Sequence, residues 1–150
     1  MLVQDVMTRN VRTVKREDSV RSVAAILCTN KISGLPVVEE GNRLVGIISE
    51  KDILNGLLPN YRTFLHDPLK QRDFESMEES YQEILTKKVE NLMTPRVFSV
   101  SPNDPILLAA SQMDLHRFRR IPVVENGDQL VGIVSLGDIH KAIFKRELEL

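Results

Sequence analysis

Hydrophobic and polar positions follow a regular order in the first part of the chain. Residues 11–14 alternate between apolar and polar, which predicts a strand, and apolar residues recur at helical spacing across residues 20–27. Two short apolar runs follow, residues 35–38 and 44–48, and the Gly-containing turn between them predicts a β-hairpin. Ser49 then stands where a further helix begins. The pattern predicts one β-α-β-β-α unit.

The same order occurs a second time. Residues 3–57 align with residues 89–143 without a gap, at a constant offset of 86 positions, which indicates an internal duplication. One copy of about 55 residues buries too little surface to be stable alone, so we expect the two copies to share a core. The predicted fold class is therefore α/β (α+β), with two β-α-β-β-α repeats. The predicted organisation is repeat 1 at residues 1–58, a helical linker at 59–88 and repeat 2 at 89–150.

The linker has no counterpart elsewhere in the chain. Residues 75–88 are rich in helix formers, with acidic residues early and lysines late, as the helix dipole favours. Met77, Tyr81, Ile84 and Leu85 would lie on one side of such a helix. The amphipathic pattern predicts either a connecting helix or an element that contacts a partner.

Composition narrows the class of protein. The net charge is -1, and this absence of a basic excess argues against nucleic-acid binding. The single cysteine, Cys28, excludes an intrachain disulfide and fits a reducing compartment, and its apolar neighbours predict a small core residue. The sequence shows neither a signal peptide nor an apolar run long enough to insert in a membrane, so we expect a cytoplasmic location.

A Gly-Ile-x-Ser-x-x-Asp motif occurs in both repeats at the same register. Its members are Gly46, Ser49 and Asp52 in repeat 1, and Gly132, Ser135 and Asp138 in repeat 2. A hydroxyl at a helix start can meet a bound phosphate, and an acid one turn later can accept hydrogen bonds from two ribose hydroxyls. The same residues also resemble a capping box, which serves the helix alone. Both interpretations stay open at this point.

Two further features distinguish the motif's surroundings. Gly46 and Gly132 interrupt apolar runs, where glycine costs stability, and a close approach of backbone or ligand would explain them. Repeat 2 also carries a basic cluster before its hairpin, and repeat 1 does not. Arg117, Arg119 and Arg120 stand where repeat 1 has Lys31, Ser33 and Gly34. The arginines either grip a phosphate or form a solvated helix end.

Catalytic and metal-binding patterns are missing from the sequence. His66, His116 and His140 do not form metal-ligand spacings, and neither a P-loop nor a nucleophile elbow occurs. His116, beside the arginines, is an exposed histidine or a phosphate contact. We therefore expect no enzyme, no metal site and no required cofactor.

The duplicated unit resembles the CBS domain. The residues that carry the resemblance are Met-Thr, Val-x-Thr/Ser-Val, Leu/Ile-Pro-Val-Val and Leu-Val-Gly-Ile-x-Ser-x-x-Asp-Ile, complete in both copies. The resemblance implies a tandem pair, or Bateman module, packed about a pseudo-twofold axis. Two clefts would each hold an adenine nucleotide (AMP, ADP or ATP) or adenosylmethionine. Many such pairs dimerise and regulate another protein, so the resemblance also implies a homodimer and an effector protein that is regulated in trans.

The resemblance also implies the residues of each cleft. Asp52 and Asp138 would hold ribose hydroxyls, and Ser49 and Ser135 would meet phosphate. The residues that would line the base or phosphate are Thr13, Ile32, Ser33, Leu35 and Pro36 in repeat 1, and Ser99, Phe118, Arg119, Arg120, Ile121 and Pro122 in repeat 2. Because the repeats differ at the arginines, we expect unequal clefts. The alternative function is a ligand-free dimerisation scaffold.

Overall fold

The computed structural model describes residues 1–57 and 78–150, which form two compact units. The repeat-1 unit contains Thr13–Val37 and Val45–Pro95. The repeat-2 unit contains Met1–Arg12, Val38–Leu44 and Arg96–Leu150. Each unit holds most of one repeat together with the opening segment of the other. In the described ranges, none of the helices has the length and apolar character needed to cross a bilayer.

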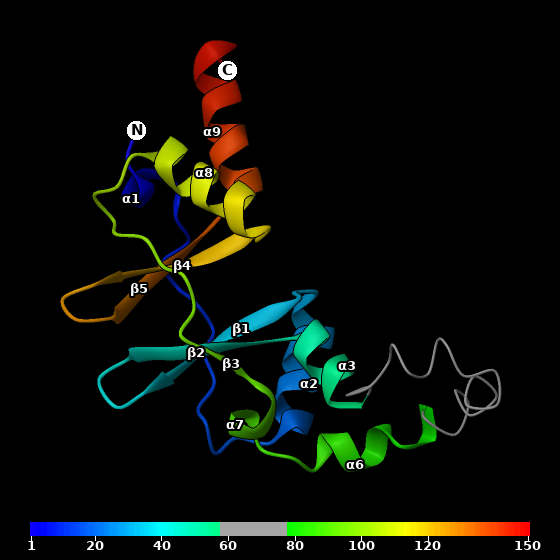
Figure 1. Cartoon of the computed structure of the whole chain (residues 1–150). Helices are drawn as coiled ribbons and strands as arrows, with labels where there is room; N and C mark the ends of the chain where they lie inside the picture. Colours follow the sequence, from blue (N-terminus) through cyan, green and yellow to red (C-terminus); the bar gives the residue numbers. More distant parts are fainter. Residues whose placement is uncertain (58–77) are drawn as a thin grey trace. The chain divides into compact units, whose positions relative to one another are not determined.

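The helices and strands recur at the predicted offset (Figure 1). The pairs of counterparts are α2 (Val20–Asn30) with α8 (Ile106–His116), β1 (Gly34–Glu39) with β4 (Arg120–Glu125), β2 (Arg43–Ser49) with β5 (Gln129–Ser135), and α3 (Glu50–Leu57) with α9 (Leu136–Glu147). The first three pairs match residue for residue at both ends. The mixed α/β class, the two hairpins and the helices that begin after Ser49 and Ser135 are confirmed.

The hairpins place the chemistry of each motif at one end of a strand pair. In the repeat-2 unit β4 and β5 are antiparallel, and Arg120 stands opposite Ser135 while Val123 stands opposite Gly132. The connecting turns contain Gly41 and Gly127, both with φ near +78°, a conformation that favours glycine. The register therefore brings the start of β4 to the end of β5, where α9 begins.

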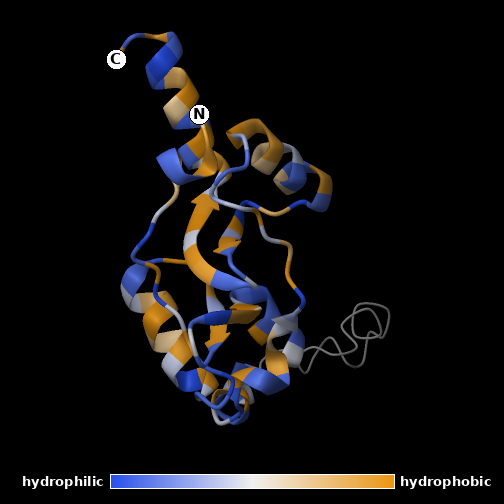
Figure 2. Cartoon of the chain, turned by 90° about the vertical axis from the view of Figure 1, so that its left-hand side faces the viewer, coloured by the Kyte–Doolittle hydropathy of each residue, from blue (hydrophilic) through white to orange (hydrophobic). Residues whose placement is uncertain are grey.

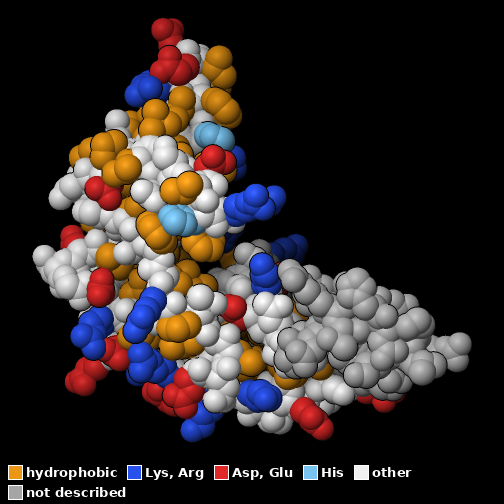
Figure 3. Space-filling view, in the orientation of Figure 1, with side chains coloured by type: hydrophobic (Ala, Val, Ile, Leu, Met, Phe, Trp, Pro, Cys, Tyr) orange, Lys and Arg blue, Asp and Glu red, His pale blue; other side chains and the backbone are white. Residues whose placement is uncertain are grey.

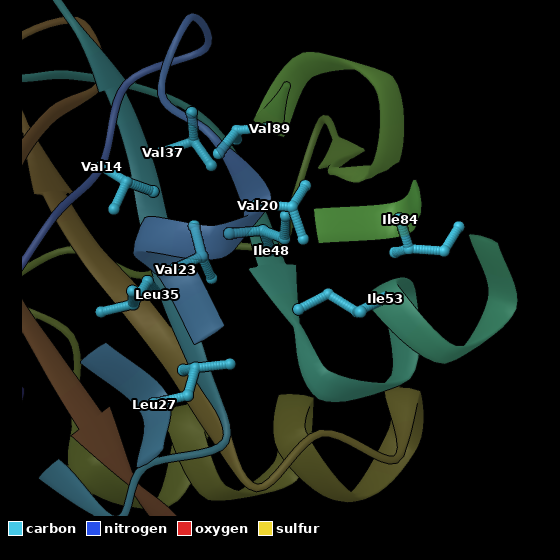
Figure 4. Packing of buried hydrophobic residues seen from close by; sticks show 10 residues of the cluster. All are labelled: Val14, Val20, Val23, Leu27, Leu35, Val37, Ile48, Ile53, Ile84 and Val89. Carbon is cyan, nitrogen blue, oxygen red and sulfur yellow. The ribbon is translucent and has the colours of Figure 1, made fainter. Parts of the chain in front are cut away.

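Most buried side chains of the two units occupy equivalent positions of the two repeats. Helices α2 and α8 bury a stripe at helical spacing, Val20, Val23 and Leu27 in α2, and the strands bury apolar side chains against it. Figure 4 shows this packing in the repeat-1 unit, and Figure 2 shows hydrophobic residues concentrated on the strands while the helices alternate in polarity. Each of the nine buried residues of the repeat-2 cluster has its counterpart 86 positions away in the repeat-1 cluster.

The first predicted strand of each repeat is wrong. Residues 11–14 and 97–100 belong to no strand. Each segment makes one parallel bridge, Val14 to Val37 and Val100 to Val123. The Val14 N–H donates to the Pro36 carbonyl at 3.1 Å. The alternation of polarity does reflect burial, because Val14 and Val100 are buried. In each segment this one buried valine, and not a hydrogen-bonded strand, produces the pattern.

Each repeat's opening segment packs in the unit formed by the other repeat, which the sequence pattern did not predict. Helical turns α1 (Val3–Val6) and α7 (Val89–Leu92) begin the two repeats, and β3 (Thr94–Pro95) follows α7. The Val3 N–H donates to the Asp104 carbonyl, and the Val89 N–H donates to the Asp18 carbonyl, each at 2.8 Å. Val3 and Val89 are fully buried. Each core is thus completed by a valine from the other repeat.

The structure describes only the last part of the predicted linker. Residues 58–77, which include Met77, His66 and the start of the predicted helix, lie outside the described residues. Within the described part, α6 covers Tyr81–Leu85 and ends there, because Thr86 is its C-cap and Lys88 bridges to Ser19. Ile84 is buried in the repeat-1 core, and the guanidinium of Arg21 donates to Gln82 at 3.2 Å. The described part of the linker is therefore a packed element of the repeat-1 unit.

Cys28 is not a core residue. Its side chain is exposed, although Leu27 before it is buried. One residue advances a helix by about 100°, so the position after a buried one turns toward the side of the stripe. The apolar neighbours of Cys28 predicted burial, but the face of the helix decides it.

Candidate functional site

Each unit brings the start of its hairpin against the start of the following helix. The Glu50 N–H donates to the Ser33 carbonyl, and the Leu136 N–H donates to the Arg119 carbonyl, both at 2.9 Å. A Cβ on Gly34 would lie 3.3 Å from the Ser49 Cβ. The structure therefore brings Ser33 to Ser49 and Arg119 to Ser135, as the predicted sites require, with each set inside one compact unit.

In the repeat-1 unit the motif forms a complete cap. The Asp52 N–H donates to Ser49 Oγ at 3.3 Å, and Asp52 Oδ2 accepts from the Ser49 N–H at 2.9 Å and from Ser49 Oγ at 3.0 Å. Asp52 Oδ1 accepts from Thr94 Oγ1 at 2.8 Å. This is the reciprocal capping box that the sequence suggested. Thr94, at β3, adds a contact from the opening segment of repeat 2.

In the repeat-2 unit the same motif makes only one of these hydrogen bonds. Ser135 Oγ accepts from the Asp138 N–H at 3.0 Å and so caps α9. The Asp138 carboxylate has no hydrogen bond or ion pair with any residue of the described ranges. Asp138 is only half buried, so that solvent or a ligand can reach it. The two acids therefore differ in availability although their sequence motifs agree.

The lack of a side chain at Gly46 and Gly132 lets the opening segments lie close to the strands. A Cβ on Gly46 would lie 2.6 Å from the Thr94 carbonyl oxygen, and a Cβ on Gly132 would lie 2.7 Å from that of Thr8. The Thr8 N–H and carbonyl pair with Ile133 at 2.8 and 2.9 Å, which fixes this approach. Of the two explanations that the sequence left open, the close approach of backbone is the one observed.

The arginines stand at the same end of the repeat-2 hairpin. Arg120 is the cross-strand neighbour of Ser135, and paired residues on antiparallel strands project to one face. The side chains of Arg119 and Arg120 are exposed, and neither has an ion-pair or hydrogen-bond partner among the described side chains. Asp138 in the first turn of α9 is likewise unpaired. This end of the unit therefore carries uncompensated charges of both signs.

The remaining predicted residues divide by burial. Leu35, Pro36, Ile121 and Pro122 are buried, so that only their main chain could face a ligand. Thr13, Ile32 and Ser99 are half-buried, and Phe118 is exposed. Thr13 and Ser99 precede the valines that bridge to Val37 and Val123, which places them beside the hairpins. Their assignment to a site stays a prediction.

Sequence reasoning missed two contacts near the sites. Thr94 was one of the identical pairs of the two repeats, with Thr8, but nothing in the pattern linked it to Asp52 across 42 positions. The rings of Phe98 and His116 lie 3.9 Å apart between centroids, and Phe118 lies 6.1 Å from His116. In the described ranges, no group of His, Cys, Asp and Glu side chains could hold a metal ion.

The family follows from the match of the whole repeat. The family model of the CBS domain matches residues 3–59 and 89–145, a pair of ranges with the same offset of 86. This chain belongs to the CBS domain family. The match covers both repeats, so the chain contains a tandem pair of CBS domains, as the sequence predicted.

Relatives and solved structures agree with this assignment. The chain is 34% identical, over 95% of its length and 91% of that protein, to the uncharacterized protein MJ1426 of Methanocaldococcus jannaschii. It superposes with a TM-score of 0.75 on CBSX2 of Arabidopsis thaliana in complex with AMP, at 30% identity over 97% of this chain and 98% of that one. A CBS domain pair of protein MJ0100, in complex with 5′-methylthioadenosine and S-adenosyl-L-methionine, gives a TM-score of 0.70 at 25% identity, over 97% of this chain and 98% of that one.

Several relatives are longer than this chain. It spans 66% of the length of the chloroplastic CBSX2 protein and 24% of two enzymes. The shared part is the CBS pair in each case.

Proposed function

We propose that this CBS pair is a regulatory module that binds an adenine nucleotide, or an adenosyl compound such as adenosylmethionine, and signals to a partner protein. The observation that carries the proposal is the half-buried Asp138 carboxylate, which is unpaired in the described ranges at the start of α9. A half-buried carboxylate without a partner is available to accept two ribose hydroxyls. The AMP complex of CBSX2 and the adenosyl complexes of MJ0100 support this class of ligand.

The other residues take roles that follow from their positions. Ser135 and Ser49, at helix starts, contact the phosphate of a nucleotide. Thr13, Ile32, Ser33, Leu35 and Pro36, with Ser99, Phe118, Ile121 and Pro122 in the other unit, line the base or phosphate, the buried members through their main chain. Asp52 holds the ribose in the repeat-1 unit, as Asp138 does in the repeat-2 unit.

The two sites differ in their affinity for phosphate. Arg119 and Arg120 grip a phosphate by paired N–H donors at the end of β5. Ser33 and Gly34 occupy the equivalent positions of the repeat-1 unit and carry no charge. A ligand with a phosphate therefore binds more tightly in the repeat-2 unit.

Calorimetry and thermal unfolding test the proposal with AMP, ADP, ATP, adenosylmethionine and NAD. A ligand that binds the native state raises Tm by mass action, and a concentration of 100 Kd adds about 2.7 kcal/mol of stability. We expect at least one of the five to do so. Asp138→Ala should weaken that binding about ten-fold or more, since a hydrogen bond to a charged group is worth about 1.5–3 kcal/mol. The variant should unfold at nearly the wild-type Tm without ligand.

The opposite results would reject the proposal. The sensing function is wrong if none of the five shifts Tm or produces heat at millimolar concentration. The assignment of Asp138 to the ligand is wrong if Asp138→Ala lowers Tm without ligand and leaves the affinity unchanged, because the residue would then be a cap only.

A ligand-free dimerisation scaffold is the alternative function. The complete capping box of Asp52 favours it, because that acid already serves the helix. Three exposed leucines of α8, Leu107, Leu108 and Leu115, favour a homodimer under either function.

The remaining parts of the proposal concern the context of the module. We propose no catalytic activity of its own, since the enzymes among the relatives contain much more chain than the CBS pair. The module requires no cofactor. The module regulates an effector protein in trans, and the single cysteine favours a cytoplasmic location.

A further inference from the structure

The hydroxyl of Thr94 is hydrogen-bonded to Asp52, the acid that would hold a ribose in the repeat-1 unit. Thr94 Oγ1 donates to Asp52 Oδ1 at 2.8 Å, while Asp52 Oδ2 already accepts two hydrogen bonds from Ser49. A ribose offers two hydroxyl donors to such an acid. The second of these donors can reach Asp52 only if an existing bond is given up or shared.

The repeat-2 unit provides an internal comparison. Thr8 is the counterpart of Thr94, and its backbone makes the same close approach to a strand glycine, at 2.7 Å against 2.6 Å. Its hydroxyl makes no bond to Asp138, and the Asp138 carboxylate has no partner in the described ranges. The backbone of the two segments therefore agrees, and the bond from threonine to acid is what differs.

We propose that Thr94 is an affinity-determining residue that competes with the ligand for Asp52, so that the repeat-1 site fills after the repeat-2 site. This inference rests on the proposed function and adds an order of filling to it. The loss of one hydrogen bond to a charged group corresponds to about a ten-fold to hundred-fold weaker affinity. Thr94 belongs to the segment that repeat 2 contributes to the repeat-1 unit, so filling the second site also releases a contact of that segment.

The difference in charge between the two sites also favours filling of the repeat-2 site first. Its effect can be separated from that of Thr94 by the choice of ligand. The segments 117–120 and 135–138 carry three arginines and one aspartate, whereas the segments 31–34 and 49–52 carry two lysines, one glutamate and one aspartate. A phosphate therefore favours the repeat-2 site electrostatically. Adenosine has no phosphate, so the change that Thr94→Val makes in the binding of adenosine measures the contribution of Thr94 without that of the phosphate.

The experiment is calorimetric titration of the full chain with AMP and with adenosine, for wild type, Thr94→Val and Thr8→Val. Valine keeps the shape of threonine and removes the hydroxyl. We expect two unequal binding events in wild type, and a second event tightened about ten-fold by Thr94→Val for both ligands. The matched control Thr8→Val should change neither event by more than about two-fold, a span of less than 0.5 kcal/mol.

Two further variants assign the events to the sites. Asp138→Ala should weaken the tight event and Asp52→Ala the weak one, each about ten-fold or more. Urea unfolding of each variant checks that it is folded. The competition is rejected if the two sites of wild type are equal for adenosine, or if Thr94→Val leaves the second event unchanged or weakens it. Absence of any binding by wild type and by all variants would instead reject the proposed function, and this inference with it.

Discussion

Gly46 and Gly132 lie inside strands, where glycine contributes no packing and loses more conformational entropy than other residues. Both are buried, and at both the space for a Cβ is occupied by the carbonyl oxygen of a threonine from the opening segment of the other repeat. The neighbouring methionines, Met93 and Met7, cover the same glycines through their sulfur atoms. The cost of each glycine is therefore offset by the docking of a whole segment.

A methyl group at either glycine should destabilise the protein. In Gly132→Ala the new Cβ would lie 2.7 Å from the Thr8 oxygen and 2.9 Å from the Met7 sulfur, so the segment must move. We expect a loss of about 1–3 kcal/mol in the free energy of unfolding, measured by urea titration. Gly46→Ala should behave in the same way.

Gly137→Ala is the matched control for these substitutions. Gly137 lies in the first turn of α9, and a Cβ there would meet only Ser135 Oγ, at 3.9 Å. Alanine favours a helix over glycine, so this variant should be neutral or more stable by up to about 1 kcal/mol. An equal loss of stability in all three variants would show that the destabilisation does not come from the close approach at the two strand glycines.

The residue scale also marks a limit of sequence reasoning. The cost of a strand glycine is visible in the sequence, so the need for a close neighbour at Gly46 and Gly132 could be predicted. The identity of that neighbour could not, because Thr94 is far along the chain from Gly46 and Thr8 from Gly132. For Cys28 the composition of the surrounding sequence misled, since the helical face and not the neighbourhood determines burial.

At the scale of elements, helices α2 and α8 have equivalent buried faces but differ in the polarity of their exposed faces. Their buried positions are equivalent throughout, but the exposed positions Leu107, Leu108 and Leu115 of α8 correspond to Arg21, Ser22 and Thr29 of α2. The three leucines are 61%, 44% and 73% exposed. Hydrophobic side chains gather on the visible surface over α8 and α9 (Figure 3). An exposed apolar patch on one copy of a duplicated helix, where the other copy is polar, is typical of an interface.

We expect that α8 forms part of a homodimer interface. The variant Leu107→Arg, Leu108→Ser, Leu115→Thr gives α8 the outer face of α2 and keeps its buried stripe. Sedimentation velocity should show a dimer for wild type and a monomer for the variant, since the triple change removes apolar surface and adds charge. A variant with Arg21→Leu, Ser22→Leu and Thr29→Leu controls for a general effect of surface leucines. A wild-type monomer, or a dimer that survives the triple change, would exclude this interface.

The elements themselves were the most predictable part of the fold. Periodicity gave the hairpins and the helices α2, α3, α8 and α9, because long stretches of one period leave little choice of structure. It failed at residues 11–14 and 97–100, where two buried valines imitate a strand, and at the end of the linker helix, where Thr86 stops α6. Polarity alone does not reveal whether an extended segment has a hydrogen-bonded neighbour.

At the scale of the whole molecule, the compact units and the sequence repeats do not coincide. The repeat-2 unit contains Met1–Arg12, and the repeat-1 unit contains Val89–Pro95. The duplication predicted that each repeat depends on the other. The reason expected from the sequence was a shared core, and the exchange of opening segments was not expected. The offset of 86 positions is the same for either connection, so the sequence could not decide between them. The packing about a pseudo-twofold axis stays a prediction.

The exchange predicts that a single repeat does not fold. A fragment of residues 89–150 lacks Val3, which is fully buried in the repeat-2 core and bonded through its N–H to the Asp104 carbonyl at 2.8 Å. It also lacks the pairing of Thr8 with Ile133, so part of its core is open to water. With about 60 residues the fragment has little stability to lose. Far-UV circular dichroism and urea unfolding should show no cooperative transition for the fragment alone.

Mixing this fragment with residues 1–88 should restore a cooperative transition, because that piece supplies the missing opening segment. The same piece carrying Val3→Asp should fail, since it would place a charge without a partner in the core, at a cost of several kcal/mol. Asp5→Ala in the same short helix changes an exposed residue and should still complement, with a loss of about 1 kcal/mol or less because Asp5 Oδ2 accepts from the Leu2 N–H. A fragment 89–150 that unfolds alone at the urea midpoint of the full chain would show that the repeats fold independently. The exchange of segments would then be a detail of connectivity without a role in stability.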